Sequence, residues 1–399
     1  MTGSMTGPLA GIRILDLPRL LPGGFCTLLL ADMGADVLKV EDTAGGDYIR
    51  WMPPYYGSEE HQREGTASAY FLALNRNKRS MRLNLKHPRG RDVLLRLVED
   101  HDVLVESFRP GVMDRLGVGW DALRERNPRL VYCPISGYGQ DGPLTERSGH
   151  DTNYLALNGL LGLTGRRGGP PVQSAGQIAD LGGGGLMAAV GILAALLERD
   201  RSGEGQMIDV SMTDGALSWL AMVAARYFAE QRVPHRGEPE LAGGIACYFP
   251  YETKDGKWVA LGALEPKFWL NWCEGAGRPD LVEKQFEHPD SQAGAEIAAV
   301  FRERTRDEWA AFAGEHDCCL EPVLDVDEVL ESELVRARGM VVELEQPGIG
   351  PVRQLGAPIK FSRTPADTSG AAPALGAHTD EVLREAGIDP GPLREEGVV

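Results

Sequence analysis

Three side chains that can carry protons lie in one short region of the chain, between residues 147 and 185. His150 and Asp151 are adjacent, and Asp180 follows about thirty positions later, shortly before four glycines at 182–185. Histidine and aspartate are among the residue types that enzymes use as general acids and bases. Inversion of a carbon atom by proton transfer needs one such group on each face of that carbon. The region is therefore a candidate active site.

An apolar run over 186–197 follows the glycines and predicts a buried helix. Asp180 is then expected as the helix N-cap or just outside the helix, where free N–H groups and the helix dipole favour a carboxylate. The four glycines cost helix stability, roughly 1 kcal/mol each relative to alanine, and so indicate close approach of a ligand or a second backbone. The simpler interpretation is that Asp180 only caps a helix and His150 only shapes a turn. The combination in one region favours chemistry.

Basic residues gather where strands are expected to begin or end. The group suits a phosphorylated ligand, because arginine can bind phosphate with two parallel hydrogen bonds. A solvated charged loop is the alternative interpretation. The members are Arg76, Lys78, Arg79, Arg82 and Arg109.

Length and composition predict a globular protein of two domains. The chain has 399 residues, 43% of them hydrophobic. A net charge of −17 argues against nucleic acid and anionic membrane as partners. Six scattered cysteines suggest neither a zinc site nor a disulfide framework. We expect no secretory signal, no apolar run of membrane-spanning length, and a cytoplasmic location.

Strands and helices alternate through the first third of the chain, which predicts a parallel sheet in a doubly wound, Rossmann-like domain. Gly137–Gly142 matches the spacing GxGxxG, but Pro143 and the polar residues after it do not open a helix, so we interpret it as a loop. The expected strands are 11–16, 35–40, 80–85, 102–106 and 130–135, and the expected helices are 25–32, 87–98 and 120–127.

A smaller α+β domain is expected after a linker rich in proline, glycine and charge. A strand at 207–211 and a helix at 214–228 precede the linker, and a hairpin of 247–253 and 258–261 follows it. Glu265 stands just before one of three helices expected at 267–275, 293–302 and 306–315. The resulting domains are 1–229 (large), 230–244 (linker), 245–330 (small) and 331–399, a return segment packing on the large domain.

The chain resembles the family III CoA-transferases, the CaiB/BaiF superfamily. The resemblance is carried by segments along nearly the whole chain, which are 8–17, 34–40, 75–80, 106–112, 136–143, 192–206 and 375–383. It implies an interlocked homodimer, each subunit with a Rossmann-like large domain and a small domain. It also implies that CoA, as part of the substrate, lies along the basic loops, with Lys39, Arg76, Lys78, Arg79, Arg109 and Tyr138 as candidate contacts.

Within the family, the chain is similar to the α-methylacyl-CoA racemases, through Gly149–Tyr154, Ala179–Gly185 and Gly262–Phe268. This similarity implies that His150 and Asp180 are the acid/base pair and that Asp151 and Glu265 support them. Neither a metal nor a redox cofactor is required for such a reaction.

Inversion of the α-carbon of a 2-methylacyl-CoA by two-base proton transfer is the function that we expect. The enolate oxygen needs hydrogen-bond donors, for which the N–H groups of 182–185 are candidates. A CoA-transferase that uses Asp180 as nucleophile is the alternative. Gly176 looks more like the transferase branch, and the loop 241–248 departs from the racemase pattern. A non-catalytic acyl-CoA-binding protein is a third possibility.

Overall fold

The computed structural model describes residues 7–399, which form two compact units. The larger unit contains the chain up to Asn158, Ala175–Trp219 and Glu333–Val399, and the smaller contains Gly159–Ser174 and Leu220–Ser332. In this division residues 159–174 and 220–229, which the sequence placed in the large domain, group with the smaller unit.

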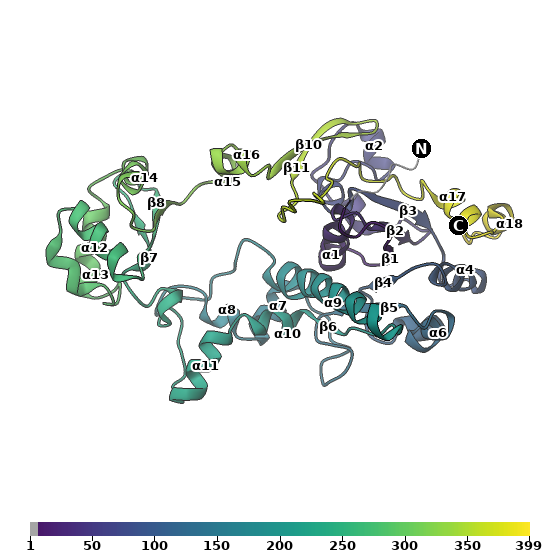
Figure 1. The fold of residues 1–399 in the computed structure, drawn as a ribbon, viewed down its shortest axis with the longest axis horizontal. Coiled ribbons are helices and arrows are strands. Elements are labelled where there is room, and N and C mark those ends of the chain that lie inside the picture. The colour runs from purple at the N-terminus through teal and green to yellow at the C-terminus, as the bar shows by residue number, and fades with distance from the viewer. Residues whose placement is uncertain (1–6) are drawn as a thin grey trace. The chain divides into compact units, whose positions relative to one another are not determined.

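A six-stranded parallel sheet, in the order β3-β2-β1-β4-β5-β6, forms the centre of the larger unit (Figure 1). This is the strand order of the doubly wound Rossmann fold, and it confirms the predicted fold class. Ligands of such sheets bind beyond the carboxyl ends of the strands where the order reverses, here between β1 and β4. The strands are β1 (Arg13–Asp16), β2 (Asp36–Glu41), β3 (Lys78–Arg82), β4 (Val103–Glu106), β5 (Val131–Ser136) and β6 (Val210–Ser211).

Helices connect and cover these strands. α1 is apolar over almost its whole surface and is buried between the sheet and the helices that follow residue 178. A hydrophobic core is formed by leucines and valines of β1, β2 and β4 together with those of α4 and α6. Val382 and Leu383 of α17 are part of this core. These helices are α1 (Leu21–Asp32), α4 (Pro88–Val98), α6 (Trp120–Arg126), α9 (Met187–Ser202) and α17 (Thr379–Glu385).

Shorter elements complete the larger unit. The C-terminal segment returns to edge strand β3, where His378 N donates to Ser80 O (2.9 Å) and Asn84 N donates to Val398 O (2.8 Å). The remaining elements are η1 (Tyr48–Trp51), α2 (Glu59–Arg63), α3 (Ala69–Asn75), α5 (Val112–Arg115), α7 (Asp151–Leu157), the π-helix η2 (Ile178–Leu186), α10 (Met212–Ser218), α16 (Glu333–Ala337), β10 (Val341–Gln346), β11 (Gly350–Leu355) and α18 (Pro390–Glu395).

The smaller unit is an antiparallel sheet of three strands covered by helices. Its core stacks aromatic rings, with Trp272 and Tyr251 both against Phe301. The predicted hairpin and three helices are confirmed. The elements are α8 (Leu160–Leu163), α11 (Ala221–Glu230), η3 (Glu240–Ala242), β7 (Tyr248–Glu252), β8 (Trp258–Gly262), α12 (Pro266–Gly275), η4 (Pro279–Lys284), α13 (Gln292–Phe301), α14 (Arg306–Glu315), β9 (Leu320–Pro322) and α15 (Val326–Leu330).

Three expectations about local structure were wrong in detail. Strand β3 begins at Lys78, two residues before its predicted start, because the basic side chains there are paired with acids and do not form a solvated loop. The helix expected at 214–228 is broken between α10 and α11. Only Val210 and Ser211 of the strand expected at 207–211 are in β6, although Met207 forms a bridge with Tyr132.

The glycine run does not interrupt the helix that follows it. η2 continues directly into α9, so Ile178–Ser202 is one helical stretch of 25 residues. An 18-residue window of this stretch has mean hydropathy 1.7, which by length and composition alone is enough to cross a membrane. The expectation that no apolar run reaches that length was therefore wrong. Half of that window is buried, because α1 and α10 pack against η2 and β5 packs against α9, as in a core helix.

Candidate active site

A pocket of about 780 Å³ opens at the carboxyl ends of the parallel strands in the larger unit. The loops after β1 and β4, the two strands at the reversal of strand order, both contribute to it. The loop after β5, the start of α7, the start of η2 and residues of η1, α3 and α10 also line it. The fold therefore places the pocket where doubly wound sheets bind their ligands.

His150 and Asp180 line this pocket together, although 29 residues separate them in the chain. His150 is the N-cap of α7, is exposed, and its backbone N–H donates to Asn153 Oδ1 (3.0 Å). Asp180 is half-buried in the first turn of η2. Asp180 therefore lies near the start of a helix, as expected, but it lies inside the helix. The N-cap is Gln177.

Asp151 connects the two segments that carry the pair. Its buried carboxylate accepts hydrogen bonds through Oδ1 from the backbone N–H groups of Ala179 (2.7 Å) and Asp180 (3.0 Å). The first N–H groups of a helix lack partners within the helix, so this carboxylate satisfies two of them. Asp151 therefore fixes the start of η2 against the start of α7, and with it the backbone of Asp180.

The carboxyl group of Asp180 has a pKa raised to about 6, against an ordinary value of 3.8. Burial is the main cause, the negative charge of Asp151 adds to it, and the proximity of His150 opposes it. A group with this pKa can both lose and gain a proton near neutral pH, which is the property of a general acid/base. Asp180 also lies in a π-helix. π-Helical turns are rare in proteins, and those that occur are often found at functional sites.

The glycines of η2 serve packing between helices. A Cβ at Gly183 would lie 2.6 Å from Met212 O and 2.7 Å from Ala216 N, and one at Gly185 would lie 2.7 Å from Pro22 O. Close approach of a second backbone, one of the two predicted reasons for the glycines, is therefore confirmed. These glycines are buried and do not line the pocket, so the expectation that their N–H groups face an enolate oxygen was wrong.

Tyr154 is a pocket residue that sequence reasoning missed. Its hydroxyl donates to Gly149 O (2.6 Å), which fixes the turn before His150. Burial raises the pKa of this phenol, so it remains a hydrogen-bond donor. Its ring meets that of Tyr138 edge to face at 5.2 Å. The signal was available, because a residue four positions after His150 in a predicted helix lies on the same face.

Three of the predicted phosphate contacts are buried and paired inside the larger unit. Lys39 Nζ lies 3.1 Å from the carboxylate of Asp47, and Arg76 forms a two-point ion pair with Asp32 (2.6 and 3.0 Å). Lys78 Nζ donates to Asp16, Thr27 and Asn75 at 2.8–2.9 Å. Desolvation of unpaired charges would be costly, so each cation is occupied by these partners. All three side chains are buried, and none of them lines the pocket of His150 and Asp180.

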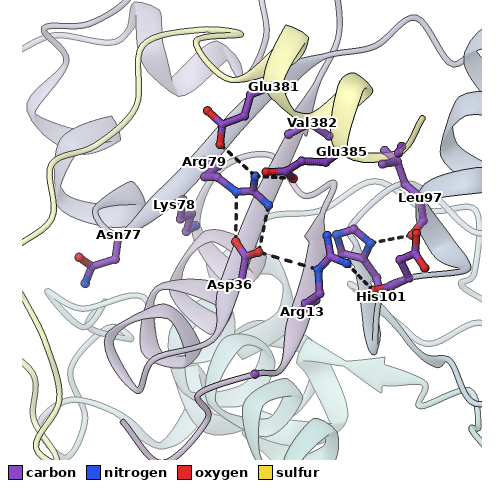
Figure 2. Close-up of a pocket in the computed structure, with 13 residues that line it drawn as sticks. Arg13, Asp36, Asn77, Lys78, Arg79, Leu97, His101, Glu381, Val382 and Glu385 are labelled. Carbon is purple, nitrogen blue, oxygen red and sulfur yellow. Dashed lines mark hydrogen bonds and ion pairs between the residues drawn. The ribbon is translucent and has the colours of Figure 1, made fainter. Parts of the chain in front are cut away.

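Arg79 lies near the amino ends of β1, β2 and β3, in a second cavity of about 820 Å³ (Figure 2). Its guanidinium donates to Asp36 (2.9 and 3.2 Å) and to Glu385 (3.0 Å). Figure 2 shows these ion pairs together with the one between Arg13 and Asp36. Arg79 therefore fastens α17 to the sheet and does not line the pocket of His150 and Asp180.

Arg109 is the member of the predicted basic group that lines the pocket of His150 and Asp180. Two arginines that the sequence did not single out, Arg19 and Arg147, line it as well, and all three are exposed. Arg19 pairs with Asp42 (2.5 Å). Each follows a strand or a turn by a few residues, a position that indicated little without the fold. Three arginines at one mouth give the pocket a positive rim that suits a phosphorylated ligand.

Glu265 belongs to the smaller unit, where it is exposed and is the N-cap of α12. The same unit holds a pocket of about 510 Å³, lined among others by Tyr248, Phe249 and Arg166. The guanidinium of Arg166 lies over the rings of Phe249 (5.7 Å) and Trp258 (5.6 Å). Among residues 7–399, no group of three or more His, Cys, Asp or Glu side chains is placed to hold a metal ion.

Comparisons with known proteins agree along nearly the whole chain. The family described as CoA-transferase family III matches residues 9–379. The alpha-methylacyl-CoA racemase of Homo sapiens is 37% identical over 95% of this chain and 94% of its own length. The succinyl-CoA:mesaconate CoA-transferase of Haloarcula marismortui is 38% identical over 98% of this chain and 99% of its own. The crystal structure of a CAIB/BAIF family protein from Brucella suis has a TM-score of 0.82 and 31% identity, covering 96% of this chain and all of that one.

Proposed function

Because the chain belongs to CoA-transferase family III, we propose that it is an enzyme that inverts the α-carbon of a 2-methylacyl-CoA thioester. One of the residues His150 and Asp180 removes the α-proton, and the other delivers a proton to the opposite face of the enolate. In the reverse direction the two exchange roles. No step requires an electron acceptor, since the carbon gains and loses only protons.

The observation that carries this proposal is the shared pocket of His150 and Asp180, with the pKa of Asp180 at about 6. A proton can be exchanged at that value without a large energetic penalty in either direction. Asp151 contributes by holding the backbone of Asp180, and Arg19, Arg109 and Arg147 supply charge for the phosphates of CoA. For Glu265 we propose support of the acid/base pair, as the family resemblance implies.

The alternative is transfer of CoA between carboxylic acids, with the Asp180 carboxylate as nucleophile. The similarity to the mesaconate transferase, of the same degree as that to the racemase, favours keeping it. At pH 7 a carboxyl group with a pKa of about 6 is mostly ionised and can attack a thioester. This reaction has no evident use for His150.

The experiment that separates the two incubates the protein with a single enantiomer of a 2-methylacyl-CoA in deuterium oxide, without an acceptor acid. Deuterium at C2 together with the opposite epimer supports the racemase. His150→Ala and Asp180→Asn should each reduce exchange by a factor of at least about 10². No exchange in the wild type, together with a thioester on Asp180 that is trapped with the acyl-CoA donor alone and is lost when an acceptor acid is added, would establish the transferase.

A homodimer and a cytoplasmic location are part of this proposal. Sedimentation of the purified protein tests the first, and a mass of one chain across micromolar concentrations would contradict it. Cell fractionation tests the second, and recovery with the membranes would contradict it.

A further inference from the structure

Lys39 lies in β2, is 1% exposed, and contacts the loop that forms one wall of the pocket. Its Nζ donates to Pro18 O (2.8 Å) and pairs with Asp47 (3.1 Å), with Asp16 further away at 3.9 Å. The surrounding carboxylates raise the pKa of this lysine, although burial opposes them. A charge so completely removed from water persists only where its partners are well placed.

Asp47 holds the same loop from the other side. Its carboxylate accepts from the backbone N–H groups of Leu20 (3.3 Å) and Ile49 (3.1 Å) and is 2% exposed. Lys39 and Asp47 together therefore bind the backbone carbonyl of Pro18 and the backbone N–H of Leu20. Arg19 lies between them and lines the pocket, and its guanidinium pairs with Asp42 at 2.5 Å.

Leu20 adopts a backbone conformation that leucine avoids, with φ 62° and ψ −149°. Glycine adopts this region readily, whereas the Cβ of other residues meets the neighbouring backbone there. Such outliers persist where the surroundings impose them, and they cluster at functional sites. Leu20 and Ile49 both line the pocket, so the strain is located in its wall.

We propose that the buried Lys39–Asp47 pair is a positioning device that holds residues 18–20 in this conformation and so places Arg19 for the anionic part of the ligand. The identity of the ligand as a CoA thioester rests on the proposed function. The loop also reaches the second basic segment, since Arg19 N donates to Ser107 Oγ (3.3 Å) and the Arg19 guanidinium lies 6.0 Å from the ring of Phe108. Displacing residues 18–20 therefore disturbs two sides of the positive rim.

A purely structural role for the pair makes a different prediction. Arg199 is 5% exposed, pairs with Asp102 (2.9 Å) in the same unit, and does not line the pocket. If buried ion pairs here serve only stability, Lys39→Met and Arg199→Met should both lower the melting temperature, and both should leave the ligand affinity unchanged. If the pair positions the loop, only Lys39→Met weakens binding.

The experiment titrates free CoA into the full-length wild type and the variants by isothermal calorimetry, with the melting temperature and circular dichroism of each. We expect Lys39→Met to weaken CoA binding about tenfold or more, the effect of misplacing a charged contact, and Arg199→Met to leave it unchanged. Asp47→Asn, which keeps the side-chain shape, takes the place of Lys39→Met if the latter does not fold.

Rescue by glycine is the sharper readout. Adding Leu20→Gly to Lys39→Met (or to Asp47→Asn) should restore part of the lost affinity, because glycine retains φ near 62° without a clamp. Leu20→Ala in the same background also shortens the side chain but keeps Cβ, so it should restore nothing. Unchanged affinity in both pair variants, or an equal loss in Arg199→Met, would overturn the inference. A wild type that binds no CoA would overturn the proposed ligand itself, which is distinguishable because no variant is then needed.

Discussion

Removing the charge of Asp151 while keeping its shape should lower the pKa of Asp180. Asp151→Asn retains an oxygen that can accept from Ala179 N and Asp180 N, so the start of η2 stays in place. The variant loses only the negative charge that helps raise the pKa of Asp180 to about 6. Since burial is the larger cause and remains, the pKa should fall only part of the way toward 3.8, by on the order of one pH unit.

In the proposed mechanism the carboxyl group of Asp180 must be ionised when it acts as the base. The acid limb of the pH profile of kcat/KM should therefore follow the loss of the proton from this carboxyl group. In Asp151→Asn that limb should move to lower pH by about one unit, and the rate at pH 5 should rise relative to the rate at pH 7.

The assay is the initial rate of deuterium incorporation at C2 between pH 4.5 and 8, for wild type, Asp151→Asn and Asp151→Ala. Asp151→Ala leaves two buried N–H groups unpaired, at a cost of about 1–3 kcal/mol each, and should lose most activity at every pH. Asp141→Asn removes an exposed charge that has no part in the pKa shift of Asp180 and serves as the control. An acid limb that stays in place or moves upward in Asp151→Asn would refute the electrostatic reasoning.

Two further predictions concern stability. Gly183→Ala places a Cβ against backbone atoms of α10 at 2.6–2.7 Å and should destabilise the larger unit by about 1–3 kcal/mol in chemical denaturation, whereas Gly162→Ala meets open space and should change little; equal effects would contradict the packing argument. Glu106 is 3% exposed, and burial raises its pKa to about 7, so the folded chain keeps a proton that the unfolded chain releases near 4.5, and stability falls as pH rises between these values. Glu106→Gln removes this dependence and should gain on the order of 2–3 kcal/mol at pH 8 relative to pH 4.5. Parallel pH dependence of urea unfolding in the two proteins would argue against it.

Local pattern determined much of the fold. The alternation of apolar strands with helical patterns between residues 11 and 135 predicted the parallel sheet. The turn at Asp255-Gly256 and the flanking strands predicted the hairpin of the smaller unit. The family followed from motifs spread over the chain, and residues 9–379 match it.

Side-chain occupancy was the information that the local pattern lacked. Lys39, Arg76 and Lys78 look like cations available to a ligand, yet each is paired with an acid. For two of them the acid comes from a distant segment, Asp32 for Arg76 at a separation of 44 residues and Asp16 for Lys78 at a separation of 62. Whether a charge is free or paired depends on which strands become neighbours. Sequence spacing does not encode that.

The sequence by itself determined which residues can transfer protons, because His150, Asp151 and Asp180 carry that chemistry in any fold. Only the tertiary structure decided that His150 and Asp180 share a pocket, that Asp151 joins η2 to α7, and that the glycines admit α1 and α10. It also placed strain at Leu20 and the arginine rim at the reversal of strand order. These features depend on contacts between segments far apart in the chain, whose geometry is set by packing of the whole unit rather than by local preference.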